Sequence, residues 1–141
     1  MLYLSAYLEK NRTEYYRLLL AVSQEGCLEE WVSFFLRGVA EQSRDAIRRS
    51  GKLLGLWQDY RKAVQVSRSS ALLLTLIDEL FDRPYITFTR AIEVLDVTYR
   101  SAQLNVQKLA AAGILHELPG RKYGRIFVAR EMVAALENSS A

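Results

Sequence analysis

The sequence has few of the residues that most catalytic and metal-binding sites use. Its 141 residues include one cysteine, Cys27, and one histidine, His116. A single cysteine excludes an internal disulfide and a zinc site built from several thiolates. His116 lacks the surrounding nucleophile and acid that acyl-transfer catalysis needs, so we interpret it as a structural or surface residue. The sequence therefore predicts that this chain alone is not an enzyme and has no catalytic residue, metal site or cofactor.

Glycine-rich loops, long hydrophobic runs and a secretion signal are also missing. The seven glycines are scattered, and neither G-x-x-x-x-G-K nor G-x-G-x-x-G occurs, so no nucleotide-phosphate loop is predicted. No apolar run approaches the roughly 20 residues that span a bilayer. The first residues do not follow the basic-then-apolar pattern of a signal peptide. We therefore expect a cytoplasmic protein without membrane contact.

What is present is the composition of a soluble globular protein. Half of the residues are hydrophobic, a quarter are charged and two are prolines, which suits one domain or two small ones. The net charge of +3 is too small to indicate a partner, but the basic residues are unevenly spread. Seven basic and two acidic residues lie in Arg44–Arg68, and a basic run without acidic residues covers Arg121–Arg130. We interpret the first run as a solvated helix face and the second as a nucleic-acid contact, although each fits both interpretations.

Residues 87–115 predict a helix-turn-helix. Apolar residues spaced three and four apart give each of two short helices a buried face, and Asp96-Val97 turns the chain between them. Thr87 and Thr98 stand where a hydroxyl caps a helix N-terminus. Gly113 follows the second helix, where a positive φ is usually needed. The predicted buried positions are Ala91, Ile92, Leu95, Ala102, Val106 and Leu109.

A basic hairpin is predicted directly after this motif. Ile114–Glu117 and Ile126–Val128 have the composition of short strands, with a turn at Leu118-Pro119-Gly120 and a basic tip at Arg121–Arg125. Tyr85-Ile86 is a third short strand candidate. A helix-turn-helix followed by such a hairpin is a winged helix, in which the second helix enters the major groove and the wing touches phosphates.

Further helices are predicted before and after the winged helix. Two short helices in the first 25 residues precede a long helical pattern from Leu28 to about Val64. Nine of eleven positions along one face of this long helix are apolar, so we expect that face to be buried along its whole length. Ala71–Phe81 and Arg130–Leu136 are predicted to be helices that flank the motif. Ser67–Ser70 is the only linker-like stretch.

The predicted fold class is mainly α. Residues 1–66 form a helical segment, and residues 67–141 form a winged helix-turn-helix domain with a small β-hairpin wing.

The second motif helix carries DNA-reading groups on the face opposite its apolar stripe. Arginine and glutamine make paired hydrogen bonds to guanine and adenine edges, and lysine suits a phosphate. An ordinary solvent-exposed helix would also be rich in these residues. Leu104 in the middle of this face suits a protein contact, unless it meets a thymine methyl group. The predicted DNA-binding residues are Thr98, Arg100, Gln103, Gln107 and Lys108 on the helix, and Arg121, Lys122 and Arg125 on the wing.

Two parts of the sequence resemble Fic-domain proteins, a family named for filamentation induced by cAMP. LYLSAYLEKNRTEYYRLLLAV, followed by a glycine and by E-x-W-x-x-F-F-L-R-G-V from Glu29 to Val39, is similar to the region after the family's active site. Ala112–Leu115 and Gly120–Val128 are similar to the end of the winged helix that follows in many bacterial members. The family's catalytic signature, H-P-F-x-(D/E)-G-N-G-R, does not occur in this sequence, so no catalytic residue carries over.

The resemblance implies a non-catalytic C-terminal module of a protein that transfers AMP from ATP to protein hydroxyls. The partner that the resemblance implies is a Fic catalytic core, if the chain is part of a longer protein. The winged helix itself is expected to bind double-stranded DNA or to position a partner. Helices that cover a core also have apolar faces, so we expect a homo-oligomer through residues 1–66. Two alternatives stay open. One is a protein–protein interaction or dimerisation module without DNA binding, and the other is an enzyme fragment whose helices complete the catalytic fold.

Overall fold

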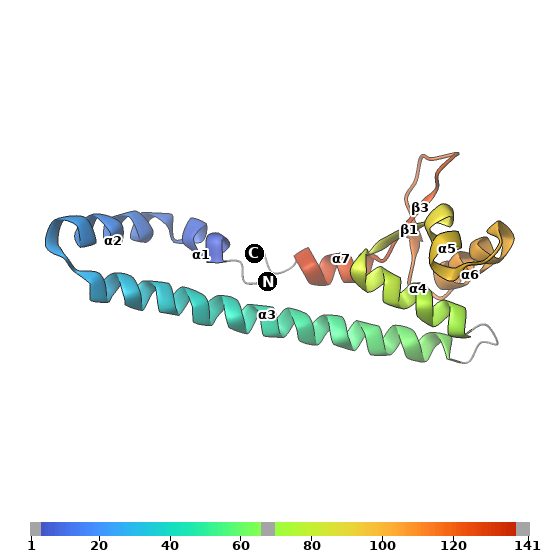
Figure 1. Ribbon diagram of the computed structural model, residues 1–141, viewed down its shortest axis with the longest axis horizontal. Coiled ribbons are helices and arrows are strands. Elements are labelled where there is room, and N and C mark those ends of the chain that lie inside the picture. The colour runs from blue at the N-terminus through green and yellow to red at the C-terminus, as the bar shows by residue number, and fades with distance from the viewer. Residues whose placement is uncertain (1–3, 66–69, 138–141) are drawn as a thin grey trace. The chain divides into compact units, whose positions relative to one another are not determined.

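The computed structural model describes residues 4–65 and 70–137, and these residues are mainly helical. They contain seven α-helices and one three-stranded antiparallel sheet (Figure 1). The predicted fold class is therefore confirmed. The chain divides into two compact units, which we call the N-terminal unit (described residues 4–51) and the winged-helix unit (described residues 52–137).

The N-terminal unit consists of α1 (Leu4–Lys10), α2 (Arg12–Glu25) and the first part of α3 (Leu28–Val64). Gly26 ends α2 with a φ of 67°, and its N–H donates a hydrogen bond to the carbonyl oxygen of Val22. A glycine stands there because other residues pay a steric penalty in this left-handed region. Figure 1 shows α2 beside the first turns of α3.

The small core of the N-terminal unit forms where α1, α2 and α3 meet. Tyr7, Leu18 and Phe34 are buried there, and the rings of Tyr7 and Phe34 lie 5.3 Å apart. Gly38 lets α1 approach α3 closely, because a Cβ at this position would lie 2.5 Å from Cδ1 of Tyr7. The absence of a side chain at Gly38 therefore permits the close packing of α1 on α3.

The prediction of one buried face along all of α3 is wrong at both ends of the helix. Leu28 and Val32 near its start and Ala63 near its end are exposed, whereas Phe34 and Gly38 on a neighbouring face are buried. The physical reason at the start of the helix is that α1 and α2 pack on the face that carries Phe34. The apolar periodicity of α3 does not by itself specify on which apolar face another helix packs.

The winged-helix unit adds α4 (Ser70–Asp82), β1 (Tyr85–Thr87), α5 (Phe88–Leu95) and α6 (Tyr99–Ala111) to the end of α3. It continues with β2 (His116–Glu117), β3 (Ile126–Val128) and α7 (Arg130–Glu137). The strands pair in the order β1-β3-β2, and both pairs are antiparallel. This order of helices and strands is that of a winged helix.

The helix-turn-helix is built by the caps that the sequence predicts. The Thr87 and Thr98 hydroxyl oxygens accept hydrogen bonds from the N–H groups of Arg90 and Ser101, at 3.2 and 3.3 Å. Asp96 takes the left-handed conformation between α5 and α6, with a φ of 51°. Gly113 follows α6 with a φ of 78°. Helix starts, turn and stop are thus all determined by local residues.

One core holds the winged-helix unit together, and the last turns of α3 belong to it. Tyr60 and Val64 of α3 are buried in this core, which also contains Leu76, Val106 and Phe127. The Tyr60 hydroxyl donates a hydrogen bond to Glu131 of α7 at 3.2 Å. Burial and this carboxylate both raise the pKa of Tyr60 above its usual value. The boundary predicted between residues 66 and 67 lies outside the described residues, while the compact unit begins at Lys52.

Candidate nucleic-acid interface

α6 has one face in the core and one face open to solvent. Ala102, Asn105, Val106 and Leu109 are buried. The opposite face carries most of the residues that the sequence predicts to read DNA. Arg100, Gln107 and Lys108 are exposed, and Gln103 is half-buried.

Two further residues of α6 lie on this open face. Leu104 is 50% exposed and Tyr99 is 56% exposed, so neither is covered by the core of the unit. Leu104 stands between Gln103 and Gln107 in helical spacing. The open face is therefore polar with one apolar residue in its middle.

Thr98 is occupied as a helix cap. Its hydroxyl oxygen accepts the N–H of Ser101, which satisfies one of the free donors at the start of α6. The hydroxyl hydrogen is still available to an acceptor such as a phosphate oxygen. Capping and a backbone contact are compatible at this position.

The wing is a short loop between β2 and β3 whose tip is fully open. Arg121, Lys122 and Tyr123 are exposed, and Tyr123 is 90% exposed. Gly120 and Gly124 flank this tip with φ values of 92° and 62°. Below the tip, the Leu118 N–H donates to the carbonyl oxygen of Ile126 at 2.9 Å. The strands thus hold a basic tip away from the core.

Arg125 lies at the base of the wing rather than at its tip. Its Nε and Nη2 donate to the two carboxylate oxygens of Glu117, at 2.6 and 2.7 Å. Its guanidinium also lies 5.5 Å from the ring centres of Phe88 and Phe127. The hydrogen bonds from Arg125 hold the pKa of Glu117 below its ordinary value. The structure thus separates Arg125 from the two other predicted wing residues.

Sequence reasoning missed Asn105, a buried polar residue on α6. Its Nδ2 donates to the carbonyl oxygen of Ser101 at 2.8 Å, and its Oδ1 is buried without a hydrogen-bond partner among the described residues. An asparagine within the spacing of Ala102, Val106 and Leu109 was the available signal, because it interrupts the apolar stripe.

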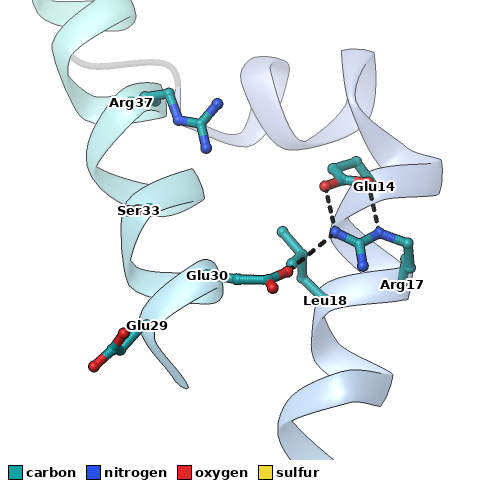
Figure 2. A pocket seen from close by; sticks show the side chains of 7 residues that line it. All are labelled: Glu14, Arg17, Leu18, Glu29, Glu30, Ser33 and Arg37. Carbon is teal, nitrogen blue, oxygen red and sulfur yellow. Dashed lines mark hydrogen bonds and ion pairs between the residues drawn. The ribbon is translucent and has the colours of Figure 1, made fainter. Parts of the chain in front are cut away.

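A second place where charges gather is a groove between α2 and α3 in the N-terminal unit. Figure 2 shows its lining residues, Glu14, Arg17, Leu18, Glu29, Glu30, Ser33 and Arg37. Arg17 donates to Glu14 at 2.9 and 2.8 Å and reaches Glu30 at 3.4 Å. The hydrogen bonds and charge of Arg17, and more weakly the charge of Arg37, lower the pKa of Glu14.

The groove is best described as a surface ion-pair network. A carboxyl group that acts as a general acid needs a raised pKa, whereas that of Glu14 is lowered. The network connects α2 and α3 and is exposed to solvent. In the part of the chain that the structure describes, no group of three or more histidine, cysteine, aspartate or glutamate side chains could hold a metal ion.

The two residues with potential reactivity have ordinary surroundings. His116 is half-buried in β2, opposite Val128 of β3. Cys27 is half-buried. Burial is the main cause that raises the pKa of its thiol, and the nearby Glu25 raises it further. A raised thiol pKa disfavours the nucleophilic thiolate form.

Across residues 4–65 and 70–137, every helix is too short or too polar to cross a membrane. A comparison of the chain with models of known protein families finds no match.

Proposed function

We propose that the winged-helix unit binds double-stranded DNA, with α6 in the major groove and the wing on the phosphate backbone. The observation that carries this proposal is the open face of α6. It presents Arg100, Gln103 and Gln107, whose side chains match base edges, on the side that the core leaves uncovered.

Each residue has a distinct role in this proposal. Arg100 pairs with a guanine edge, and Gln103 and Gln107 pair with adenine edges. Lys108 and the wing residues Arg121 and Lys122 lie along phosphates, where they position the protein without reading sequence. Thr98 donates its hydroxyl to a phosphate at the start of α6.

The test is a mobility-shift series with the full chain and random or genomic duplexes at low salt. We expect binding, and we expect Arg100→Ala to relax the preference at one base position at a cost of about 1–3 kcal/mol. Lys10→Ala removes one charge from the N-terminal unit, which has none of the proposed DNA contacts, and should not change the preference. Absence of binding at about ten micromolar protein would leave a protein-interaction module as the better interpretation.

A second candidate function, self-association through the N-terminal unit, is favoured by apolar residues on α3. Leu28, Val32 and Leu36 are spaced four residues apart and are exposed, as is Ile47 further along the helix. Large contiguous apolar patches on a protein surface mark interaction sites. We propose a second copy of the chain as the partner. Sedimentation of the wild type against Leu36→Glu tests this, and a clean monomer at tens of micromolar wild-type protein would contradict it.

We also propose that the chain is the C-terminal module of a Fic-type protein and transfers no AMP by itself. The stretch from Leu2 to Val39 and the Ala112–Leu115 ending support this proposal. An in-frame H-P-F motif upstream of the Met1 codon would identify the catalytic core as the partner of these helices. Calorimetry that detects ATP binding at micromolar affinity to this chain would overturn the proposed catalytic silence.

A further inference from the structure

The base of the wing contains an ion pair between Glu117 and Arg125, a residue that the sequence predicts to bind DNA. Arg125 gives two N–H groups to Glu117, at 2.6 and 2.7 Å, and both side chains are only about a third exposed, at 36% and 38%. A two-pronged arginine–carboxylate pair of this kind occupies the guanidinium in a fixed geometry. A phosphate would have to displace Glu117 to use the same donors.

The pair also connects the wing to the first residue of α6. The Arg125 guanidinium lies 5.5 Å from the rings of Phe88, at the start of α5, and Phe127, in β3. The Phe88 ring in turn meets Tyr99 edge-on, with centres 5.8 Å apart at 75°. The wing base, α5 and the start of α6 therefore share one cluster.

The tip of the wing differs from its base. Arg121 and Lys122 are exposed and, among the described residues, form no ion pair. Two cations are thus presented to solvent, while the third is held between a carboxylate and two rings.

We propose that Glu117 and Arg125 form a positioning pair, which holds the wing at the angle that brings Arg121 and Lys122 onto the DNA backbone. Arg125 itself makes no phosphate contact. This inference rests on the proposed DNA binding. Glu117 then supports DNA binding although its charge opposes the DNA phosphates.

The negative charge of Glu117 means that the two explanations predict opposite changes in DNA affinity for Glu117→Gln. Glu117→Gln makes the protein more positive by one charge, and electrostatics alone would strengthen DNA binding. If Glu117 acts by holding Arg125, the same change instead weakens binding several-fold. Arg125→Gln should weaken it by a similar factor, and the double variant should lose no more than either single variant, because both changes break one pair.

The salt dependence of binding provides the second readout. Each phosphate contact contributes about 0.9 to the slope of log affinity against log salt concentration. The slope should be the same in the wild type, Glu117→Gln and Arg125→Gln. Arg125→Lys keeps the charge but loses the planar fork and the stacking, and it should weaken binding as much as Arg125→Gln does.

The experiment measures anisotropy of a labelled duplex with the full chain and these variants, with thermal unfolding to confirm that each is folded. Glu137→Gln adds the same charge on α7 and serves as the matched control, which should not weaken binding. Tighter binding by Glu117→Gln, a slope lowered by about 0.9 in Arg125→Gln, or near-wild-type binding by Arg125→Lys would overturn the positioning role. Absence of binding by the wild type would instead overturn the proposed function, and with it this inference.

Discussion

The two units of the chain differ in how they cover their own apolar residues. Among the described residues, eighteen buried residues form one continuous core in the winged-helix unit, whereas three form the core of the N-terminal unit. Both units leave large apolar side chains exposed, among them Leu28 and Leu36 in the N-terminal unit and Leu54 and Leu104 in the winged-helix unit. The units therefore differ in the size of the core that each one builds.

The difference follows from the number of neighbours that each helix has. In the winged-helix unit, Leu76 and Leu80 of α4 and Val106 of α6 contribute to one core with α5, α7 and the sheet, and are buried completely. In the N-terminal unit, α1 and α2 cover one face of α3 around Phe34 and leave the face of Val32 open. The uncovered apolar face of α3 is the observation on which the proposed self-association rests.

The comparison predicts that a leucine-to-alanine substitution costs much more stability in the core of the winged-helix unit than on the open face of α3. Leu76→Ala, at a site with 0% exposure, should destabilise the winged-helix unit by about 2–5 kcal/mol. Leu36→Ala, at 58% exposure, should change the stability of the dissociated chain by less than about 0.5 kcal/mol. Urea unfolding of both variants, at a protein concentration where sedimentation shows a monomer, measures this difference. Equal losses in the monomer would show that Leu36 is covered within its own unit and would contradict the comparison.

A second prediction concerns the close approach of α1 to α3 at Gly38. Gly38→Ala places a methyl group 2.5 Å from Cδ1 of Tyr7 and should cost about 1–3 kcal/mol through overpacking. Gly51→Ala lies on the same helix with no atom within 4 Å, and it should be neutral or stabilising by up to about 1 kcal/mol. The urea unfolding midpoints of the two variants, compared with that of the wild type, measure both effects. A neutral Gly38→Ala would mean that α1 does not depend on this contact.

Leu104 extends the comparison, because it is one of the exposed leucines of the winged-helix unit, together with Leu54, Leu118 and Leu136. If it meets a thymine methyl group, replacing that thymine by uracil should weaken wild-type binding by about 0.8 kcal/mol or less. Leu104→Ala should not respond to the same change. The measurement is a titration of paired duplexes that differ by one methyl group. An equal response of both proteins would point to a protein contact at Leu104 instead.

The smallest expected effect is a pH dependence of stability that both units share. Arg125 lowers the pKa of Glu117, and Arg17 lowers that of Glu14. A folded-state pKa below the unfolded value stabilises the protein above the usual carboxyl pKa, and this stabilisation is lost as the pH falls through the folded value. As the pH is lowered from about 6 to 3, the midpoint temperature of thermal unfolding should therefore fall less steeply for Glu117→Gln and Glu14→Gln than for the wild type. Parallel curves would show that neither pair contributes.

Most of the winged helix could be predicted from the sequence, because local residues determine it. Thr87, Thr98 and Gly113 mark helix ends through their own backbone and hydroxyl groups. The basic tip likewise lies between two strand-like segments. These features need no knowledge of distant residues.

The remaining features depend on contacts that a local pattern does not contain. The pairing of Arg125 with Glu117 depends on the register of β2 and β3, which the sequence does not specify. The open face of α3 depends on where α1 and α2 pack. The position of Tyr60 depends on Glu131, 71 residues later in the chain.

The salt dependence of duplex binding tests the central claim, that the winged-helix unit binds DNA with its wing on phosphates, most directly. Log affinity of the wild type should fall linearly with log salt, and Arg121→Ala/Lys122→Ala should reduce the slope by about 1.8, the value of two phosphate contacts. Lys10→Ala/Arg44→Ala, which removes the same charge from the N-terminal unit, should leave the slope unchanged. No binding at low salt, or the same slope in both double variants, would contradict the account.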